Sequence, residues 1–230
     1  MGRLKVKICG ITSVADAVAA QAAGADYLGL NFYAESPRCI TPDAAREIVR
    51  ATPRCRHVGI VVQPSDDDLE RLGGVPLHLI QMYAGEELQN SRALHLLKTP
   101  IALAASIGTF EEYLSLKSLQ DSYLQAGHKV PLFVLDAKVP GLYGGTGQTA
   151  KWETLRPPRP GESTFRRVPR HSDFYFLLAG GLHPDNVAEA VRIVQPFGVD
   201  VASGVESAPG VKDAVMMRRF VTAARNAEGR

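Results

Sequence analysis

The sequence predicts a single (β/α)8 barrel, an α/β fold in which parallel strands alternate with helices, over residues 1–230. Eight short apolar runs alternate with amphipathic segments along the whole chain. The alternation shows no break in composition, and 230 residues is close to the roughly 250 typical of such barrels. An open doubly wound sheet is the main alternative. Eight strands favour the barrel because that number closes.

The strands are predicted from apolar runs that are short and bounded by turn residues. The run RHVGIVV at 56–62 is one example, between Pro53 and Ser65. In chain order the predicted strands are 5–11, 27–32, 56–62, 77–82, 101–107, 132–137, 174–179 and 198–203.

The helices are predicted from capping residues and apolar periodicity. Ser13, three residues before Asp16, predicts a helix that ends near Ala23, with Gly24 as the residue after its last turn. Further helices are predicted at 44–51, after Ser65, at 86–97 and from Thr109 to about 125. A sixth helix is predicted to end near 156, and the last two are predicted at 185–194 and 212–225.

Composition limits the classes of partner. The net charge is +2, and hydrophobic and charged residues make up 45% and 22% of the chain. This balance indicates neither a nucleic-acid nor a membrane surface, so we expect a small-molecule partner. No apolar run reaches the roughly 18 residues of a membrane span, and the N-terminus lacks a signal-peptide pattern, so a cytoplasmic protein is expected. The chain could be a monomer or a homodimer.

The three cysteines, Cys9, Cys39 and Cys55, form no CxxC pair. We therefore expect reduced thiols, with neither a disulfide framework nor a metal site. The histidines likewise lack metal-ligand spacing.

Three segments share one form, an apolar strand, then small residues, then a helix. They are LFVLDAKVPGLYGGTGQTAKW at 132–152, FYFLLAGGLHPDNVAEAV at 174–191 and GVDVASGVESAPGVKDAV at 198–215. Glycine-rich turns at strand ends let backbone amides approach phosphate oxygens, and the loops after strands seven and eight are the usual phosphate position of a barrel. The alternative is that the glycines only make tight turns. The residues expected to bind phosphate are Gly144, Gly145, Gly180, Gly181, Ser203 and Gly204.

Five ordered blocks resemble phosphoribosylanthranilate isomerase, a barrel enzyme of tryptophan biosynthesis. They are KICGIT at 7–12, SPRCITP at 36–42, LDAKVPGLYGGTGQT at 135–149, LAGGLHPDNV at 178–187 and GVDVASGVESAPGVKD at 198–213. The resemblance implies a cofactor-free Amadori rearrangement of N-(5-phosphoribosyl)anthranilate, an intramolecular aldose–ketose oxidoreduction. It covers nearly the whole chain.

The resemblance implies that Cys9 is the general base and Asp136 the general acid. Ring opening needs an acid at the ribose oxygen, and a base must then remove the C2 proton. An ordinary Cys has a pKa of about 8.5 and an ordinary Asp about 3.9, so each starts in the wrong state at neutral pH. We expect positive charge such as Lys7 to favour the thiolate, and burial to keep Asp136 protonated. Spacing alone would make Cys9 a packing residue.

Further site residues are expected by resemblance. Arg38 is similar to the family residue that holds the anthranilate carboxylate, a role suited to a guanidinium. Lys7 and Gln81 are also expected to bind substrate. Four positions depart from the family pattern, namely Gln63, Tyr83, Gln148 and Lys151.

Two alternatives remain open. One is a related barrel isomerase acting on another phosphoribosyl amine, such as the aminoimidazole carboxamide ribotide of histidine synthesis, which typically has an aspartate at the position of Cys9. The other is a non-catalytic phosphosugar-binding barrel. The Pro- and Arg-rich segment at about 156–173 is expected to be a solvated loop on the face opposite the site.

Overall fold

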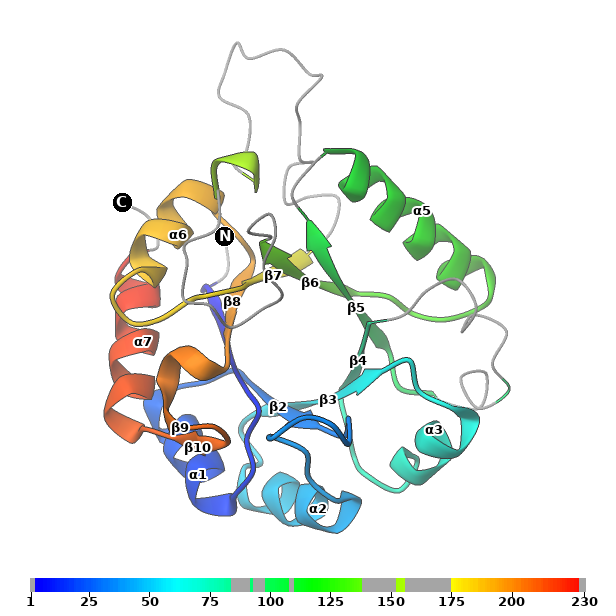
Figure 1. Ribbon diagram of the computed structural model, residues 1–230, viewed down its shortest axis with the longest axis horizontal. Helices are drawn as coiled ribbons and strands as arrows, with labels where there is room; N and C mark the ends of the chain where they lie inside the picture. Colours follow the sequence, from blue (N-terminus) through cyan, green and yellow to red (C-terminus); the bar gives the residue numbers. More distant parts are fainter. Residues whose placement is uncertain are drawn as a thin grey trace.

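The computed structural model describes residues 3–83, 92, 98–107, 110–137, 152–155 and 175–227. Its centre is a closed barrel of eight parallel strands, each hydrogen-bonded to the next and β8 to β1 (Figure 1). The predicted fold class is therefore confirmed. The strands are β1 (Lys5–Cys9), β2 (Tyr27–Asn31), β3 (Arg56–Val62), β4 (Leu79–Tyr83), β5 (Ile101–Ile107), β6 (Leu132–Ala137), β7 (Tyr175–Ala179) and β8 (Gly198–Val201).

The helices lie outside the ring of strands (Figure 1). They are α1 (Val14–Ala23), α2 (Pro42–Ala51), α3 (Asp66–Leu72), α5 (Phe110–Gln125), α6 (Val187–Val194) and α7 (Ala214–Asn226), with short 3-10 turns η2 (Trp152–Leu155) and η4 (Ser203–Val205). Figure 1 shows α7 beside α1, so the last helix and the first cover adjoining parts of the barrel. No helix of the described segments is long and apolar enough to cross a membrane.

Capping residues determine where the helices start and stop. The side chain of Ser13 accepts a hydrogen bond from the Asp16 amide, and Gly24 ends α1 in the left-handed conformation at φ 96°. Ser65 and Asp68 form a complete capping box at α3. The Ser13 cap, the role of Gly24 and a helix beginning after Ser65 were predicted from the sequence, whereas the capping box was not.

Several predicted boundaries differ from the structure by one or two residues, and two of them have a clear local reason. Strand β1 ends at Cys9 because Gly10 takes φ +72°. Helix α7 begins at Ala214 because the Asp213 side chain caps it by accepting from Val215 and Met216 amides. Lys212, expected to begin this helix, belongs instead to a small antiparallel hairpin of β9 (Glu206–Ala208) and β10 (Val211–Lys212). The sequence analysis did not predict this hairpin.

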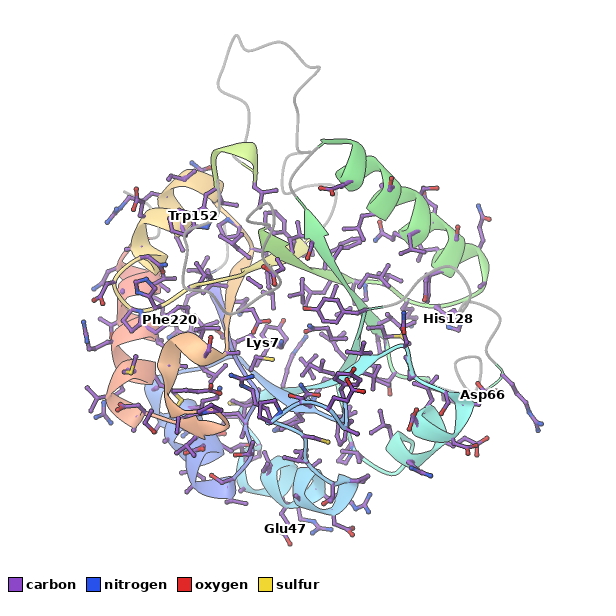
Figure 2. The ribbon with its side chains drawn as sticks, in the orientation of Figure 1. Lys7, Glu47, Asp66, His128, Trp152 and Phe220 are labelled. Atoms are coloured by element: carbon purple, nitrogen blue, oxygen red, sulfur yellow. The ribbon has the colours of Figure 1, made fainter. Side chains whose placement is uncertain are left out.

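Strand alternation divides the side chains between two environments. On β6, Phe133 and Leu135 pack in the large core between strands and helices, whereas Leu132 and Val134 belong to a smaller cluster inside the barrel. Residue Asp136, two positions beyond Val134, therefore faces the interior at the carboxyl end of β6. The same alternation on β1 places Lys7 and Cys9 inside, and Figure 2 shows Lys7 within the ring of strands.

Some predictions fall outside the described residues. These are most of the helix at 86–97, the glycine loop with Gly144 and Gly145, and the Pro- and Arg-rich segment at 156–173.

Candidate active site

The carboxyl ends of the eight strands define one mouth of the barrel, which is where barrel enzymes carry their chemistry. Strand β1 delivers Cys9 to this mouth and β6 delivers Asp136. The register pairs Asp136 with Ser106 on one side and Ala179 on the other. Because β7 and β8 lie between β6 and β1, the thiol and the carboxyl group stand on different sides of a single opening.

Beneath Cys9 the barrel contains a buried charge pair. The Lys7 ammonium donates to Asp200 Oδ2 and to Gln81 Oε1, each at 2.9 Å. Lys7 has no exposed side-chain surface, and Gln81 is 3% exposed. Both residues were expected to bind substrate. The Lys7 ammonium also forms a side-chain hydrogen bond with Cys9. Substrate binding by Lys7 and Gln81 stays a prediction.

The environment of Cys9 differs from the expected one. Burial is the main influence on its thiol and raises the pKa; the Asp200 charge acts in the same direction. Lys7 and Lys212 oppose this shift, as the sequence analysis expects of a nearby cation, but they do not outweigh it. The pKa of Cys9 therefore lies above its ordinary value, and the free site favours the thiol over the thiolate.

The carboxyl group of Asp136 is shifted in the expected direction. Burial raises its pKa, and the charge of Asp200 adds to the effect. Asp200 was not predicted from the sequence as a site residue. Its position in β8, paired in register with Lys7, explains why it influences both Cys9 and Asp136. A signal was available, because a lone acid inside the apolar strand GVDV is costly to bury unless it is paired.

Tyr83 ends β4 and belongs to the same opening. The residue is 38% exposed, but burial of its phenol raises the pKa to about 12, and the charges of Asp200 and Asp136 contribute. The phenol is therefore a neutral hydrogen-bonding group at neutral pH. Gln63, the other departure from the family pattern after an adjacent strand, is exposed and takes φ +42° at the end of β3.

Arg38 reaches the mouth from the loop between β2 and α2. The loop is fixed locally because the Ser36 hydroxyl accepts hydrogen bonds from the Arg38 amide and from the Asn31 side chain. Arg38 Nε and Nη2 donate to the two oxygens of Glu206 at 2.7 and 2.6 Å. The guanidinium is thus already engaged along one edge, by a residue that the sequence analysis did not single out.

The glycine turns after β7 and β8 pack against each other. Gly180 and Gly181 take φ +94° and +61°, which favour glycine over other residues. Gly204 lies so close to the Leu182 carbonyl that a Cβ would overlap it. Ser203 and Gly204 form the turn η4, directly after β8.

The side chain of Asn186 fixes the conformation of the turn after β7. Asn186 donates from Nδ2 to the Gly181 carbonyl at 2.9 Å and accepts from the His183 amide at 2.8 Å. Among the hydrogen bonds of the described residues, none is donated by the Gly180 or Gly181 amide. Two such amides at the usual phosphate position of a barrel suit an anionic oxygen.

A separate cavity of about 520 Å³ lies at the opposite end of the barrel. Its lining includes Arg3, Lys5, Asp26, Arg54 and Arg56, near the amino ends of β1, β2 and β3. It holds neither Cys9 nor Asp136. Within the described ranges, no group of three or more His, Cys, Asp and Glu side chains could hold a metal ion.

A closed parallel barrel with a thiol, a carboxylic acid and two glycine turns at its carboxyl end is the arrangement of a (β/α)8 enzyme that moves protons on a phosphorylated substrate. The model of the family N-(5'phosphoribosyl)anthranilate (PRA) isomerase matches residues 6–223. The chain belongs to this family.

Relatives and solved structures agree with the family model. The chain is 40% identical over 228 residues to N-(5'-phosphoribosyl)anthranilate isomerase of Pseudomonas aeruginosa (strain LESB58), covering 98% of this chain and 97% of the relative. It is 38% identical to the enzyme of Chlorobaculum parvum, covering 97% and 96%. The phosphoribosyl anthranilate isomerase structure from Thermotoga maritima superimposes with a TM-score of 0.78 at 32% identity, covering 97% of this chain and 99% of that one.

Proposed function

We propose that this chain catalyses the isomerisation of N-(5'-phosphoribosyl)anthranilate to 1-(o-carboxyphenylamino)-1-deoxyribulose 5-phosphate, an intramolecular oxidoreduction in tryptophan biosynthesis. One observation carries the proposal: a chain of this family keeps Cys9 and Asp136 at the carboxyl ends of β1 and β6, facing one opening. A solved family structure, at 28% identity and a TM-score of 0.74, is a complex with the reduced form of that ketose phosphate.

Asp136 is proposed as the acid that protonates the ribose ring oxygen. Burial and the neighbouring Asp200 raise its pKa, which keeps a larger fraction of the carboxyl group protonated. Once the ring has opened, Cys9 is proposed to remove the C2 proton, and the enolamine then tautomerises to the ketone.

The raised pKa of Cys9 determines how activity should depend on pH if Cys9 is the base and Asp136 the acid. The active form needs a thiolate and a carboxylic acid together, whereas the free site favours a thiol. Activity is then expected to rise with pH as Cys9 loses its proton and to fall as Asp136 loses its own. The active species is a minor one at the optimum.

The remaining groups are proposed to bind the two ends of the substrate. The amides after β7 and β8, at Gly180, Gly181, Ser203 and Gly204, suit the phosphate, and the geometry of η4 and of the Asn186-braced turn supports this. Gly144 and Gly145, which lie outside the described residues, are also proposed to bind the phosphate. Arg38 is proposed to bind the anthranilate carboxylate.

The test follows the loss of fluorescence of freshly made phosphoribosylanthranilate. Wild type is expected to consume it, and Cys9→Ser and Asp136→Asn are each expected to lose at least about 100-fold in kcat/KM, the usual scale for deleting an acid or base. Cys55→Ser and Asp121→Asn make the same chemical changes away from the mouth and should retain activity.

The outcomes separate the alternatives. Binding of the reduced ketose phosphate without turnover by wild type would point to a phosphosugar-binding barrel. Turnover only of the aminoimidazole carboxamide ribotide would point to the related isomerase. If wild type is active and Cys9→Ser stays within a few-fold of it, the role of Cys9 as base is wrong.

Cell location and assembly are also proposals. The three cysteines are free, as expected of a protein of the cytoplasm. We propose a cofactor-free enzyme acting on a small phosphoribosyl substrate, without nucleic acid or membrane, as a monomer or a homodimer. A solved relative from Thermotoga maritima is described as dimeric. Light scattering of the purified chain would decide between the two states.

A further inference from the structure

The hairpin β9–β10 lies at the rim of the barrel, beside α1 (Figure 1), and carries two buried charges that lead to Arg38. Glu206, with 5% of its side chain exposed, accepts hydrogen bonds from Arg38 Nε and Nη2. Lys212, whose side chain has no exposed surface, donates to Glu206 Oε1 at 2.7 Å and to the Ala202 carbonyl at 3.0 Å. The three side chains form a continuous chain of charged contacts from the end of β8 to the guanidinium.

The hairpin is itself braced against the loops around Cys9. The Thr12 hydroxyl donates to the Gly210 carbonyl at 2.6 Å, and the Lys212 amide donates to Asp16 Oδ2 at 3.2 Å. Gly210, at φ +81°, packs so closely that a Cβ would stand 3.0 Å from the Pro37 carbonyl. The hairpin therefore contacts both the loop that follows Cys9 and the loop that carries Arg38.

The aliphatic arm of Arg38 is confined as well. It crosses Gly10, where an added Cβ would overlap the Arg38 Cδ. Nε and Nη2 bind Glu206, so one edge of the planar guanidinium is used. A guanidinium has five N–H donors, and the end formed by Nη1 and Nη2 still presents a second pair to a planar carboxylate.

The net charge of Arg38, Glu206 and Lys212 favours binding of an anionic group. Arg38 and Glu206 alone would be neutral and would attract a substrate carboxylate weakly. Lys212 adds a second cation, so the three groups together carry one net positive charge. Burial raises the pKa of Glu206, but hydrogen bonds from Arg38 and Lys212 outweigh it and leave the pKa below its ordinary value. Glu206 is accordingly a carboxylate at neutral pH.

We infer that Glu206 and Lys212 are positioning residues that give this enzyme its preference for a substrate with an aryl carboxylate. Glu206 holds the Arg38 guanidinium through Nε and Nη2, which leaves the Nη1–Nη2 end for the substrate carboxylate, and Lys212 fixes Glu206 and supplies the net positive charge. This inference rests on the proposed function, and it adds two residues that act through Arg38 and do not themselves touch the substrate.

The experiment measures the dissociation constants of two probes by calorimetry. One is reduced 1-(o-carboxyphenylamino)-1-deoxyribulose 5-phosphate, and the other is the same molecule without the carboxyl group. Wild type is expected to bind the carboxylated probe at least about 10-fold more tightly, as befits a charge-assisted bidentate contact. The ratio of the two constants is the readout, because a loss of folded protein does not change it.

Glu206→Gln is expected to bring this ratio close to one while leaving the affinity for the carboxyl-free probe within about three-fold of wild type. The sign of this change is decisive, because removing Glu206 makes the cluster more positive. A ratio that rises would show that Glu206 acts only through its charge and would overturn the inference. Equal weakening of both probes would assign Glu206 a structural role only and would overturn it too.

Two further variants keep the inference testable if Glu206→Gln does not fold. Glu206→Asp keeps the charge but withdraws the carboxylate by one methylene, and it is expected to lower the ratio. Lys212→Met is expected to lower it through the lost charge, whereas Lys117→Met, which removes an exposed lysine of α5, should leave it unchanged. Arg38→Lys should lower it as much as Glu206→Gln, and the double variant should lose nothing further.

Failure of the proposed function would look different. If wild type turned over no phosphoribosylanthranilate yet showed the expected probe ratios, the positioning roles of Glu206 and Lys212 would be supported and the catalytic proposal would be wrong. If wild type were active but had a probe ratio of one, the inference would fall and the catalytic proposal would stand.

Discussion

Lys7 is a charged side chain without exposed surface at the centre of a barrel (Figure 2). Burial disfavours its charge, but the Asp200 carboxylate and Cys9 more than compensate, so its pKa lies above the ordinary value. Asp200 Oδ2 binds the ammonium, whereas Oδ1 has no hydrogen-bond partner among the described residues. The pair therefore depends on both members, because removal of either leaves an isolated charge in the interior.

Single and double substitutions should show this dependence. Lys7→Met and Asp200→Leu are each expected to lower the free energy of unfolding by about 3–5 kcal/mol, the scale for an uncompensated buried charge. The double variant should lose less than either single variant, because no charge remains unpaired. Urea unfolding followed by circular dichroism measures all three. Additive losses in the double variant would contradict this account.

At this scale the sequence could indicate the residues near motifs but not their partners. Cys9, Asp136 and Arg38 were found through motif resemblance. Asp200, Glu206 and Lys212 stood in a quoted block, GVDVASGVESAPGVKD, but were assigned no role. Their roles depend on contacts with residues far away in the chain, such as the 168 positions between Arg38 and Glu206. Local pattern carries no information on such pairs.

Among the secondary-structure elements, α6 ends in a strained residue. Gln195 caps it at φ 50°, in the left-handed region that suits glycine or asparagine, and its amide donates to the Val191 carbonyl. A side chain with a Cβ costs roughly 1 kcal/mol in this conformation. The C-terminus of α6 is therefore less stable than it would be with glycine at this position.

Gln195→Gly is expected to raise the free energy of unfolding by about 0.5–1 kcal/mol, because it relieves the left-handed strain. The expected gain is smaller than the full strain because glycine also increases the entropy of the unfolded chain. Chemical denaturation compares it with Arg192→Gly, a change to glycine inside the same helix, which should be destabilising. A loss of stability in Gln195→Gly would contradict the role of the cap.

The sequence predicted the elements better than their ends. Strands β3, β5 and β6 have the predicted bounds, because each is a mainly apolar run that ends at turn or loop residues. The hairpin β9–β10 was missed because its strands have three and two residues, too few to show a period. It forms through a turn at Gly210 and through contacts with loops from the other end of the chain.

For the molecule as a whole, His57 links stability to pH. It lies 1% exposed on β3, and burial lowers its pKa to about 4. The Thr52 hydroxyl donates to the Ile48 carbonyl, so it accepts from His57 Nε2 at 2.9 Å. His57 Nδ1 has no partner within the described segments, and a proton placed there would be buried without an acceptor.

Acid is therefore expected to weaken the fold in a defined range. The unfolded chain takes up a proton at His57 near pH 6.5, but the folded chain only near pH 4. The contribution of His57 is complete above pH 6.5 and is lost as pH falls toward 4, by at most about 3 kcal/mol. Urea unfolding between pH 4 and 7.5 measures it. His57→Gln should flatten this slope, whereas His183→Gln, at a more exposed histidine, should not.

The pairing of β1 with β8 has a consequence for synthesis. A ribosome makes β1 first and β8 last, and the carboxylate that neutralises Lys7 emerges 193 residues after it. Until then the nascent chain has an open sheet edge at β1 and an unpaired ammonium behind it. The barrel therefore cannot close until β8 has been synthesised, and its assembly waits for the last of its eight strands.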